Sequence, residues 1–275
     1  MARDTLKLNC WTGPPAGVPF LFVHGLLRNW RCFFPLFADL EHRWQLYSVD
    51  HRGHGQSPRG LHYRVADYVP DLVQFLHHGI DRPAVVYGHS LGAMVAAAAA
   101  AAAPGRVRAL ILEDPPFETM GSRLAGTPLL DYFRAIRPVL GSREPVPDLA
   151  RRLAGLEVPG GRLGEQRDPV TLRFMARSFR HVDPAVLEPV LAGEWLAGYD
   201  PGRVFHGIAC PILMFQSDPA HGGMLTAADA ASLSRTASDC TVIRLDGVGH
   251  QAHWAAAPAI LRHLHGFLAT LEFEP

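Results

Sequence analysis

Ala84-Val-Val-Tyr-Gly88-His89-Ser90-Leu91-Gly92 is the stretch that decides the fold, and it runs into Ala-Met-Val and eight alanines, Ala96–Ala103. The apolar run predicts a buried strand, and the alanine run has the strongest helix propensity in the chain. Between them stands the pattern G-x-S-x-G at a strand-to-helix turn. Such a turn strains the serine backbone, and side chains at the two glycine positions would collide. We therefore expect Ser90 to be a nucleophile raised above a sheet edge, with the Leu91 amide facing a developing negative oxygen.

Similar apolar runs recur along the chain and alternate with helical patterns. Because the runs are almost continuously apolar, they predict strands that are covered on both faces, as in a largely parallel sheet. Alternating strands and helices indicate an α/β fold with a mostly parallel central sheet flanked by helices. The expected strands are 20–23, 46–49, 84–87, 109–112, 212–215 and 241–245, and the expected helices are 66–79, 91–103, 227–237 and 256–271.

One long segment breaks this alternation. Between Pro115 and Pro211 no strand-like run occurs, but short helical patterns do. We expect an inserted helical cap, residues 116–205, on a core formed by 1–115 and 206–275. An insertion at the carboxyl edge of a sheet would lie over whatever binds there. The helices expected in the cap are 127–139, 146–155, 169–181 and 184–197.

His250 is the histidine expected to activate Ser90. Most of the fifteen histidines are expected to be structural, but His250 follows the last predicted strand in a glycine-flanked loop, Gly247-Val-Gly-His250. A serine hydroxyl is a poor nucleophile near neutral pH and needs an imidazole to take its proton. His253 and Trp254 are expected to line or support the site. The spacing of His250 and His253 would suit a metal, but we identify no acidic or cysteine partner for them and expect no metal.

These motifs together resemble the α/β-hydrolase superfamily over nearly the whole chain. The resemblance rests on His24-Gly25, Asp50–Ser57, Gly88–Gly92, Asp114-Pro115 and Gly249-His250. It implies the chain order serine, acid, histidine, and it assigns a structural role to the Asp50–Ser57 turn. It also implies a second oxyanion donor, the N–H of Leu26, beside that of Leu91. His24 is expected mainly to order its turn. The expected substrate contacts are His24, Gly25, His89 and Trp254.

The acid of the triad departs from the common pattern of this superfamily. There it often follows the strand before the histidine strand as G-x-x-D, but here the corresponding position falls on Ala220 and Asp218 comes two residues early. Other members place the acid after an earlier strand, which would be Asp114, with Glu113 as a lesser choice. Either aspartate would orient the imidazole and stabilise its cation. We favour Asp218 over Asp114.

Composition limits the partners. Acidic and basic residues balance at 26 each, so nothing indicates a nucleic acid or an anionic membrane. The N-terminal residues lack the apolar run of a signal peptide, and the alanine-rich stretch 91–103 is too short to span a bilayer. We expect a cytoplasmic, soluble monomer or homodimer that binds a small molecule and needs no cofactor. The four cysteines form no C-x-x-C pair, which argues against zinc or a disulfide framework: Cys10, Cys32, Cys210 and Cys240.

Three functions fit these residues. The first is an esterase or lactonase that cleaves a small, largely apolar carbonyl substrate through a Ser-His-Asp triad and an acyl-enzyme. The second is hydrolysis of a carbon–carbon bond in a ketone-containing metabolite. The third is a non-catalytic ligand-binding member of the fold, because a fold alone does not establish activity. Haloalkane dehalogenases and epoxide hydrolases are disfavoured, since these relatives carry aspartate where this chain has Ser90.

Overall fold

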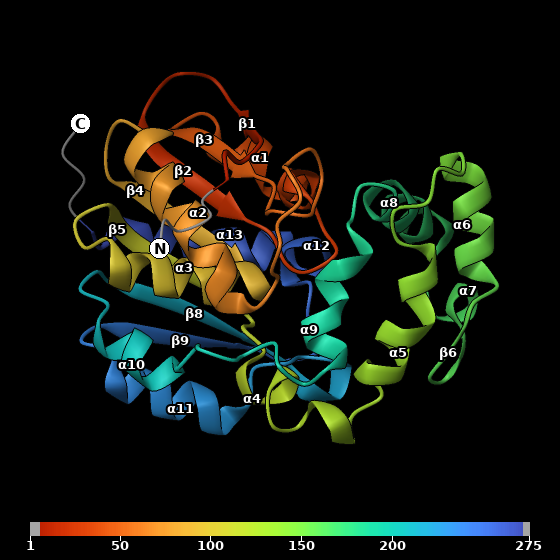
Figure 1. Ribbon diagram of the computed structural model, residues 1–275. Coiled ribbons are helices and arrows are strands. Elements are labelled where there is room, and N and C mark those ends of the chain that lie inside the picture. Colours follow the sequence, from red (N-terminus) through yellow and green to blue (C-terminus); the bar gives the residue numbers. More distant parts are fainter. Residues whose placement is uncertain (1–5, 272–275) are drawn as a thin grey trace.

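The central feature of the structure, a computed structural model that describes residues 6–271, is a seven-stranded sheet (Figure 1). Its strand order is β1-β3-β2-β4-β5-β8-β9, and all neighbours are parallel except the edge pair β1 and β3. The six strands expected from the sequence are confirmed. Strand β1 was not predicted, because it is a three-residue edge strand without alternation. The strands are β1 Cys10–Thr12, β2 Val18–Val23, β3 Trp44–Val49, β4 Ala84–His89, β5 Val107–Glu113, β8 Ile212–Ser217 and β9 Cys240–Leu245.

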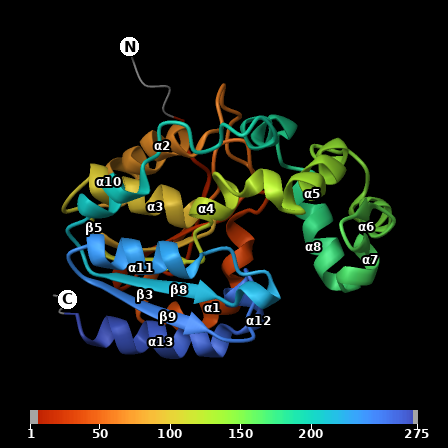
Figure 2. The same ribbon diagram turned by 90° about the horizontal axis from the view of Figure 1, so that it is seen from below.

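Helices cover both faces of the sheet, as the continuously apolar strands require (Figure 2). Helices α2, α3 and α11 lie on one face, and α1 and α13 lie on the other. Strand side chains alternate between the two resulting cores: Leu21 packs into the first and Phe22 into the second. The bounds of these helices are α1 Phe34–Leu40, α2 Val65–His78, α3 Leu91–Ala102, α11 Ala227–Thr236 and α13 Ala257–Ala269.

The strand order reverses direction between β2 and β4. From β2 the chain moves outward to β3, whereas β4, β5, β8 and β9 follow one another toward the opposite edge. Val23, the last residue of β2, pairs with Gly88 near the end of β4. Ligands of open α/β sheets bind outside the carboxyl ends of the strands at such a reversal. The turn after β2 and the turn around Ser90 therefore face one crevice.

The segment between β5 and β8 is mainly helical, and its helices α5–α8 lie beyond the carboxyl ends of the strands (Figure 1). Its short hairpin of β6 and β7 contradicts the expectation that no strand occurs there. Helix α10 packs on α3 and α11 of the core, and the exact cap boundary stays a prediction. The elements are α4 Phe117–Met120, η2 Leu124–Gly126, α5 Leu129–Ile136, η3 Arg137–Val139, α6 Val146–Ala154, β6 Glu157–Val158, β7 Gly161–Arg162, α7 Leu163–Gln166, α8 Pro169–Phe179, η4 Pro184–Leu187, α9 Glu188–Leu191 and α10 Pro201–His206.

The expectations that the protein is cytoplasmic and that it is soluble remain predictions. Residues 1–5, which carry most of the N-terminal sequence used for the localisation prediction, lie outside the described residues, as do 272–275. Across residues 6–271 no helix has the length and apolar character needed to cross a membrane.

Candidate active site

Ser90 occupies the sharp turn between β4 and α3. Its backbone has φ 55° and ψ −119°, a conformation that is rare for a residue with a side chain. A Cβ atom on Gly92 would stand 2.0 Å from the carbonyl oxygen of Val23, and one on Gly88 would stand 2.4 Å from that of Gly92. Both glycines are therefore required by close backbone approach. The Ser90 N–H donates to the carbonyl of Glu113 at 2.9 Å, which ties the turn to β5.

The turn after β2 passes directly over Ser90. A Cβ on Gly25 would lie 3.0 Å from the Ser90 Cβ, and Leu27 has a positive φ of 65°. The N–H groups of Leu26 and Leu91 donate to no protein acceptor anywhere in residues 6–271. Leu26 lines the cavity next to Ser90, and Leu91 is the first residue of α3. Both amides are therefore free for an anionic oxygen.

Two buried histidines hold this turn in place. The Nδ1 of His24 donates to the Gly25 carbonyl at 2.8 Å and its Nε2 accepts from the His51 N–H at 3.0 Å. His54 accepts from the Leu27 N–H at 3.1 Å. Burial lowers the pKa of His24 to about 4 and that of His54 to about 3, so both rings are neutral acceptors. Neither His24 nor Gly25 is among the residues that line the cavity, and their expected role as substrate contacts stays a prediction.

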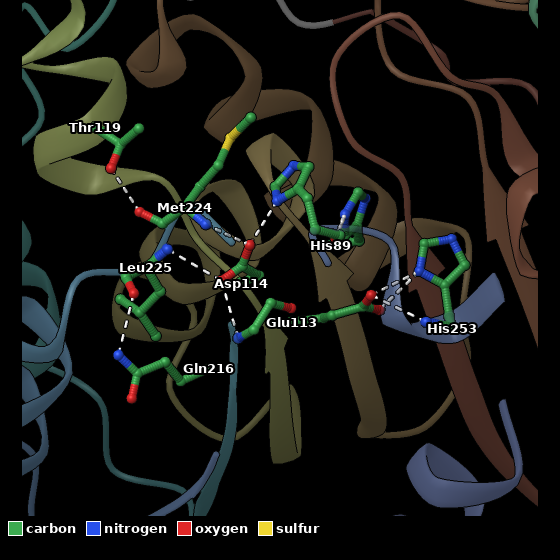
Figure 3. Close-up of polar contacts among 10 residues, drawn as sticks. His89, Glu113, Asp114, Thr119, Gln216, Met224, Leu225 and His253 are labelled. Atoms are coloured by element: carbon green, nitrogen blue, oxygen red, sulfur yellow. Dashed lines mark hydrogen bonds and ion pairs between the residues drawn. The ribbon is translucent and has the colours of Figure 1, made fainter. Parts of the chain in front are cut away.

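His250 and Asp114 meet across the sheet edge. The Nδ1 of His250 lies 2.6 Å from Oδ2 of Asp114, and the carboxylate is fully buried. Asp114 has a positive φ of 48°, which turns its side chain out of the line of β5. Its oxygens also accept the backbone N–H groups of Met224 and Leu225 at 2.8 and 3.0 Å (Figure 3), and that of Ser217 at 3.2 Å. This carboxylate is therefore fixed by hydrogen bonds from a neighbouring strand and its loop.

Asp218, the acid favoured from the sequence, does not contact His250. Its carboxylate accepts from the backbone N–H groups of Ala220 and Gly247, both at 2.9 Å, and lies 3.1 Å from Nδ1 of His221. These bonds cap a short 3-10 turn, η5 Pro219–His221, and hold the loop that follows β9. The structure thus brings Asp114, and not the favoured Asp218, to His250, because the Asp218 carboxylate is engaged in loop capping.

Glu113 points to the opposite side from Asp114, toward His253 (Figure 3). Its carboxylate lies 2.8 Å from the His253 Nδ1 and accepts from the Tyr87 hydroxyl at 2.7 Å. Burial opposes ionisation, but His253 and His89 outweigh it and lower the pKa of Glu113 to about 2.

One ligand atom from each of His89, Glu113 and His253 lies within 4.8 Å of the others, so these three buried residues are the group best placed to hold a metal in residues 6–271. The sequence did not indicate Glu113 as the partner of His253, because 140 positions separate the two residues.

His89 and Trp254 both line the cavity, as expected for substrate contacts. The Nε2 of His89 donates to the His250 carbonyl at 2.8 Å, and burial holds the pKa of His89 well below its usual value. His89 therefore also supports the histidine loop. Trp254 is 44% exposed and its ring lies 5.3 Å from that of Phe174 in α8, so it bridges core and cap.

A cavity of about 870 Å³ joins these groups between the core and the inserted helices. Ser90 and His250 both line it. No hydrogen bond joins the Ser90 hydroxyl to His250 among the described residues, but catalytic hydrogen bonds are often long until a ligand binds. Because Asp114 occupies Nδ1, the Nε2 of His250 is the ring nitrogen left for Ser90. The sequence did not predict that Arg28 lines the cavity or that the amides of Met224 and Leu225 hold Asp114, and none of the three has a distinct sequence signal.

Comparisons with known proteins agree with the fold. The profile of the alpha/beta hydrolase fold matches residues 18–148. A pimeloyl-[acyl-carrier protein] methyl ester esterase of Methylococcus capsulatus is 32% identical over 234 residues, covering 70% of this chain and 86% of the esterase. A 2-(acetamidomethylene)succinate hydrolase of Mesorhizobium japonicum is 25% identical over 266 residues, covering 92% of this chain and 88% of that protein. A crystal structure of E-2-(acetamidomethylene)succinate hydrolase, 23% identical, shares the fold with a TM-score of 0.76 and 96% coverage of each chain.

Proposed function

Because this chain belongs to the α/β-hydrolase superfamily, we propose that it is a serine hydrolase that cleaves an ester or lactone bond of a small carbonyl substrate. The observation that carries the proposal is the 2.6 Å contact between His250 and the buried Asp114, in the loop that lines the same cavity as Ser90. The methyl ester esterase with 32% identity supports an ester as the bond cleaved.

The first half of the proposed reaction forms an acyl-enzyme. The Ser90 Oγ attacks the carbonyl carbon while its proton passes to Nε2 of His250, and Asp114 stabilises the resulting imidazolium. The carbonyl oxygen becomes an oxyanion that accepts from the N–H groups of Leu26 and Leu91. Collapse of this intermediate breaks the C–O bond, and His250 returns the proton to the leaving alcohol oxygen. For a lactone, that oxygen stays attached to the acyl chain.

The second half releases the acid. A water molecule gives a proton to the neutral His250 and attacks the acyl carbon, and the same two amides hold the second oxyanion. Breakage of the acyl–Ser90 bond returns the proton from His250 to the serine oxygen. The apolar part of the substrate would contact aromatic side chains of the cavity wall, Phe133 and Phe179 from the inserted helices and Trp254 from the core.

Ester hydrolysis by the purified protein tests this function. We expect the protein to hydrolyse 4-nitrophenyl hexanoate, which is measured by the absorbance of the released nitrophenolate. We expect Ser90→Ala to lose this turnover and to keep an unchanged circular dichroism spectrum. A vinylogous diketone measured in parallel tests cleavage of a carbon–carbon bond. Turnover of the diketone alone contradicts the ester proposal, and turnover of neither substrate favours a ligand-binding role. Ester turnover that persists in Ser90→Ala contradicts the assignment of the nucleophile.

A further inference from the structure

Arg28 is a cation in the wall of the cavity beside Ser90. It is half-buried, it lines the cavity with Ser90, and it forms an ion pair with no carboxylate in residues 6–271. Its hydrogen-bonding partner is the neutral side chain of Gln251, whose amide oxygen accepts from Nε at 3.3 Å and also from Nη2. Gln251 directly follows His250, so this contact places the guanidinium beside the reacting groups. Charged groups are rarely left half-buried and unpaired in a protein without a function.

Two further donors from the inserted helices surround the same part of the cavity. Burial lowers the pKa of Arg28, and the like charge of Arg167 lowers it further, while Tyr132 acts in the opposite direction. Burial raises the pKa of Tyr132, and both arginines oppose that rise. Arg167 also forms no ion pair among the described residues, and the Tyr132 hydroxyl has no protein acceptor there. Arg28 donates to Gln251 and Arg167 to the Gln166 carbonyl, but within residues 6–271 neither guanidinium has a carboxylate partner, although both line the cavity with Tyr132.

Among the described residues that line the cavity, Asp168 is the acidic one. Its carboxylate is already hydrogen-bonded to groups of its own helix. Its carboxylate accepts the N–H groups of Val170 and Thr171 at 2.8 and 3.0 Å and the Thr171 hydroxyl at 2.5 Å, at the N-terminus of α8. These hydrogen bonds lower the pKa of Asp168, and its position is open to solvent. It therefore does not neutralise Arg28, which faces the side of Gln251.

We propose that Arg28, with Arg167 and Tyr132, forms a subsite for a carboxylate group of the substrate. This inference rests on the proposed function and narrows it: the ester or lactone would carry a free carboxylate a few bonds from the scissile carbonyl. The planar guanidinium fork matches a carboxylate with two parallel hydrogen bonds, and charge-assisted bonds of this kind are about twice as strong as neutral ones. A bound carboxylate would also supply the counter-charge that the fold does not give Arg28.

Matched ester pairs test the subsite. Mono-4-nitrophenyl adipate and 4-nitrophenyl hexanoate have acyl chains of equal length that end in a carboxylate and a methyl group, and the readout is the ratio of their kcat/KM values. We expect this ratio to fall by roughly 10- to 100-fold in Arg28→Gln, the loss of a charge-assisted hydrogen bond. The control Arg143→Gln removes an exposed arginine that does not line the cavity, and it should leave the ratio unchanged. An unchanged ratio in Arg28→Gln overturns the proposal.

A second variant separates carboxylate binding from a merely structural clamp. Gln251→Glu places a carboxylate against Arg28 and should strengthen their contact while occupying the guanidinium. The subsite predicts that this variant also lowers the acid-to-neutral ratio, by at least about 10-fold. If Arg28 only holds the histidine loop, Gln251→Glu will leave the ratio as in the unaltered protein, and the proposal fails.

Direct binding keeps this test independent of hydrolysis. Calorimetric titration of Ser90→Ala with monomethyl adipate and with methyl hexanoate compares the same two chain ends without turnover. We expect the adipate to bind more tightly and this preference to disappear in the Ser90→Ala, Arg28→Gln double variant. Equal affinities in Ser90→Ala overturn the subsite. If the protein hydrolyses neither ester but keeps an Arg28-dependent preference for monomethyl adipate, the proposed function fails and the subsite stands.

Discussion

The Nδ1 atom of His250 lies 2.6 Å from Oδ2 of Asp114, although the two residues are 136 positions apart in the chain. Asp114 is held by three backbone N–H groups from β8 and the loop after it, so its position does not depend on His250. A carboxylate fixed in this way can select the histidine tautomer that leaves Nε2 as the proton acceptor. This contact supports Asp114, the residue after β5, as the acid of the proposed triad.

Replacement of Asp114 and of Asp218 by asparagine, one at a time, tests which aspartate is the acid of the proposed triad. We expect Asp114→Asn to lower kcat for ester hydrolysis on the order of 10³- to 10⁴-fold, because an amide cannot stabilise the imidazolium and favours the wrong tautomer. Asp218→Asn is the matched control and should cause only a small decrease, since Asp218 does not contact His250 and an asparagine oxygen can still accept the Gly247 N–H that holds the loop before it. Steady-state kinetics on one ester measure both. A severe loss in Asp218→Asn with a mild effect of Asp114→Asn would refute the assignment.

The glycine after the nucleophile should tolerate no side chain. Because a Cβ on Gly92 would stand 2.0 Å from the Val23 carbonyl, Gly92→Ala must displace β2 or the turn, and we expect a loss of about 3 kcal/mol or more in the free energy of unfolding. Gly266→Ala in α13 meets open space and should stabilise the protein by up to about 1 kcal/mol. Urea unfolding compares the two. A Gly92→Ala protein as stable as the unaltered chain would show that the backbones are not so close.

Acid should destabilise the protein through its buried histidines. His24 and His54 have pKa values of about 4 and 3 in the folded state, below the 6.5 of the unfolded chain. Unfolding therefore binds protons between these values, and stability is full above pH 6.5 and falls as the pH is lowered toward 4. Each such histidine contributes a slope of about 1.4 kcal/mol per pH unit.

Replacement of one histidine tests the origin of that slope. Gln in place of His54 keeps a donor and an acceptor without titrating, so His54→Gln should be less stable at pH 7.5 but should lose stability less steeply between pH 6.5 and 4. Urea unfolding at a series of pH values gives the slope. Glu113 acts in the same direction only at lower pH, because its pKa is lowered to about 2 and its contribution is lost below about pH 4.5. Equal slopes in the two proteins would contradict the histidine account.

The sequence was sufficient for the sheet and the serine turn because both rest on local patterns. Continuous apolar runs mark strands buried on both faces, and the two glycines around Ser90 are dictated by backbone contacts within one turn and with β2. The position of His250 followed from chain order and from its glycine-flanked loop. These features need little knowledge of distant contacts.

The acid could not be chosen from the sequence because two strands end side by side. Glu113 of β5 pairs with Phe215 of β8, so Asp114 and Asp218 leave the same sheet edge from neighbouring strands. Which of them meets His250 depends on the positive φ of Asp114 and on loop capping by Asp218, and neither has a sequence signature. Arg28 of the proposed carboxylate subsite was also not predicted, since arginine supplies nearly all basic residues and a single one carries little signal.

The most direct test of the account is covalent labelling of the intact protein with a fluorophosphonate, followed by mass spectrometry of its peptides. If the serine on the turn after β4 is activated by His250, one phosphonyl group will be found per chain, on Ser90, and His250→Ala will react far more slowly. A protein that hydrolyses esters but acquires no adduct on Ser90 would contradict the central claim.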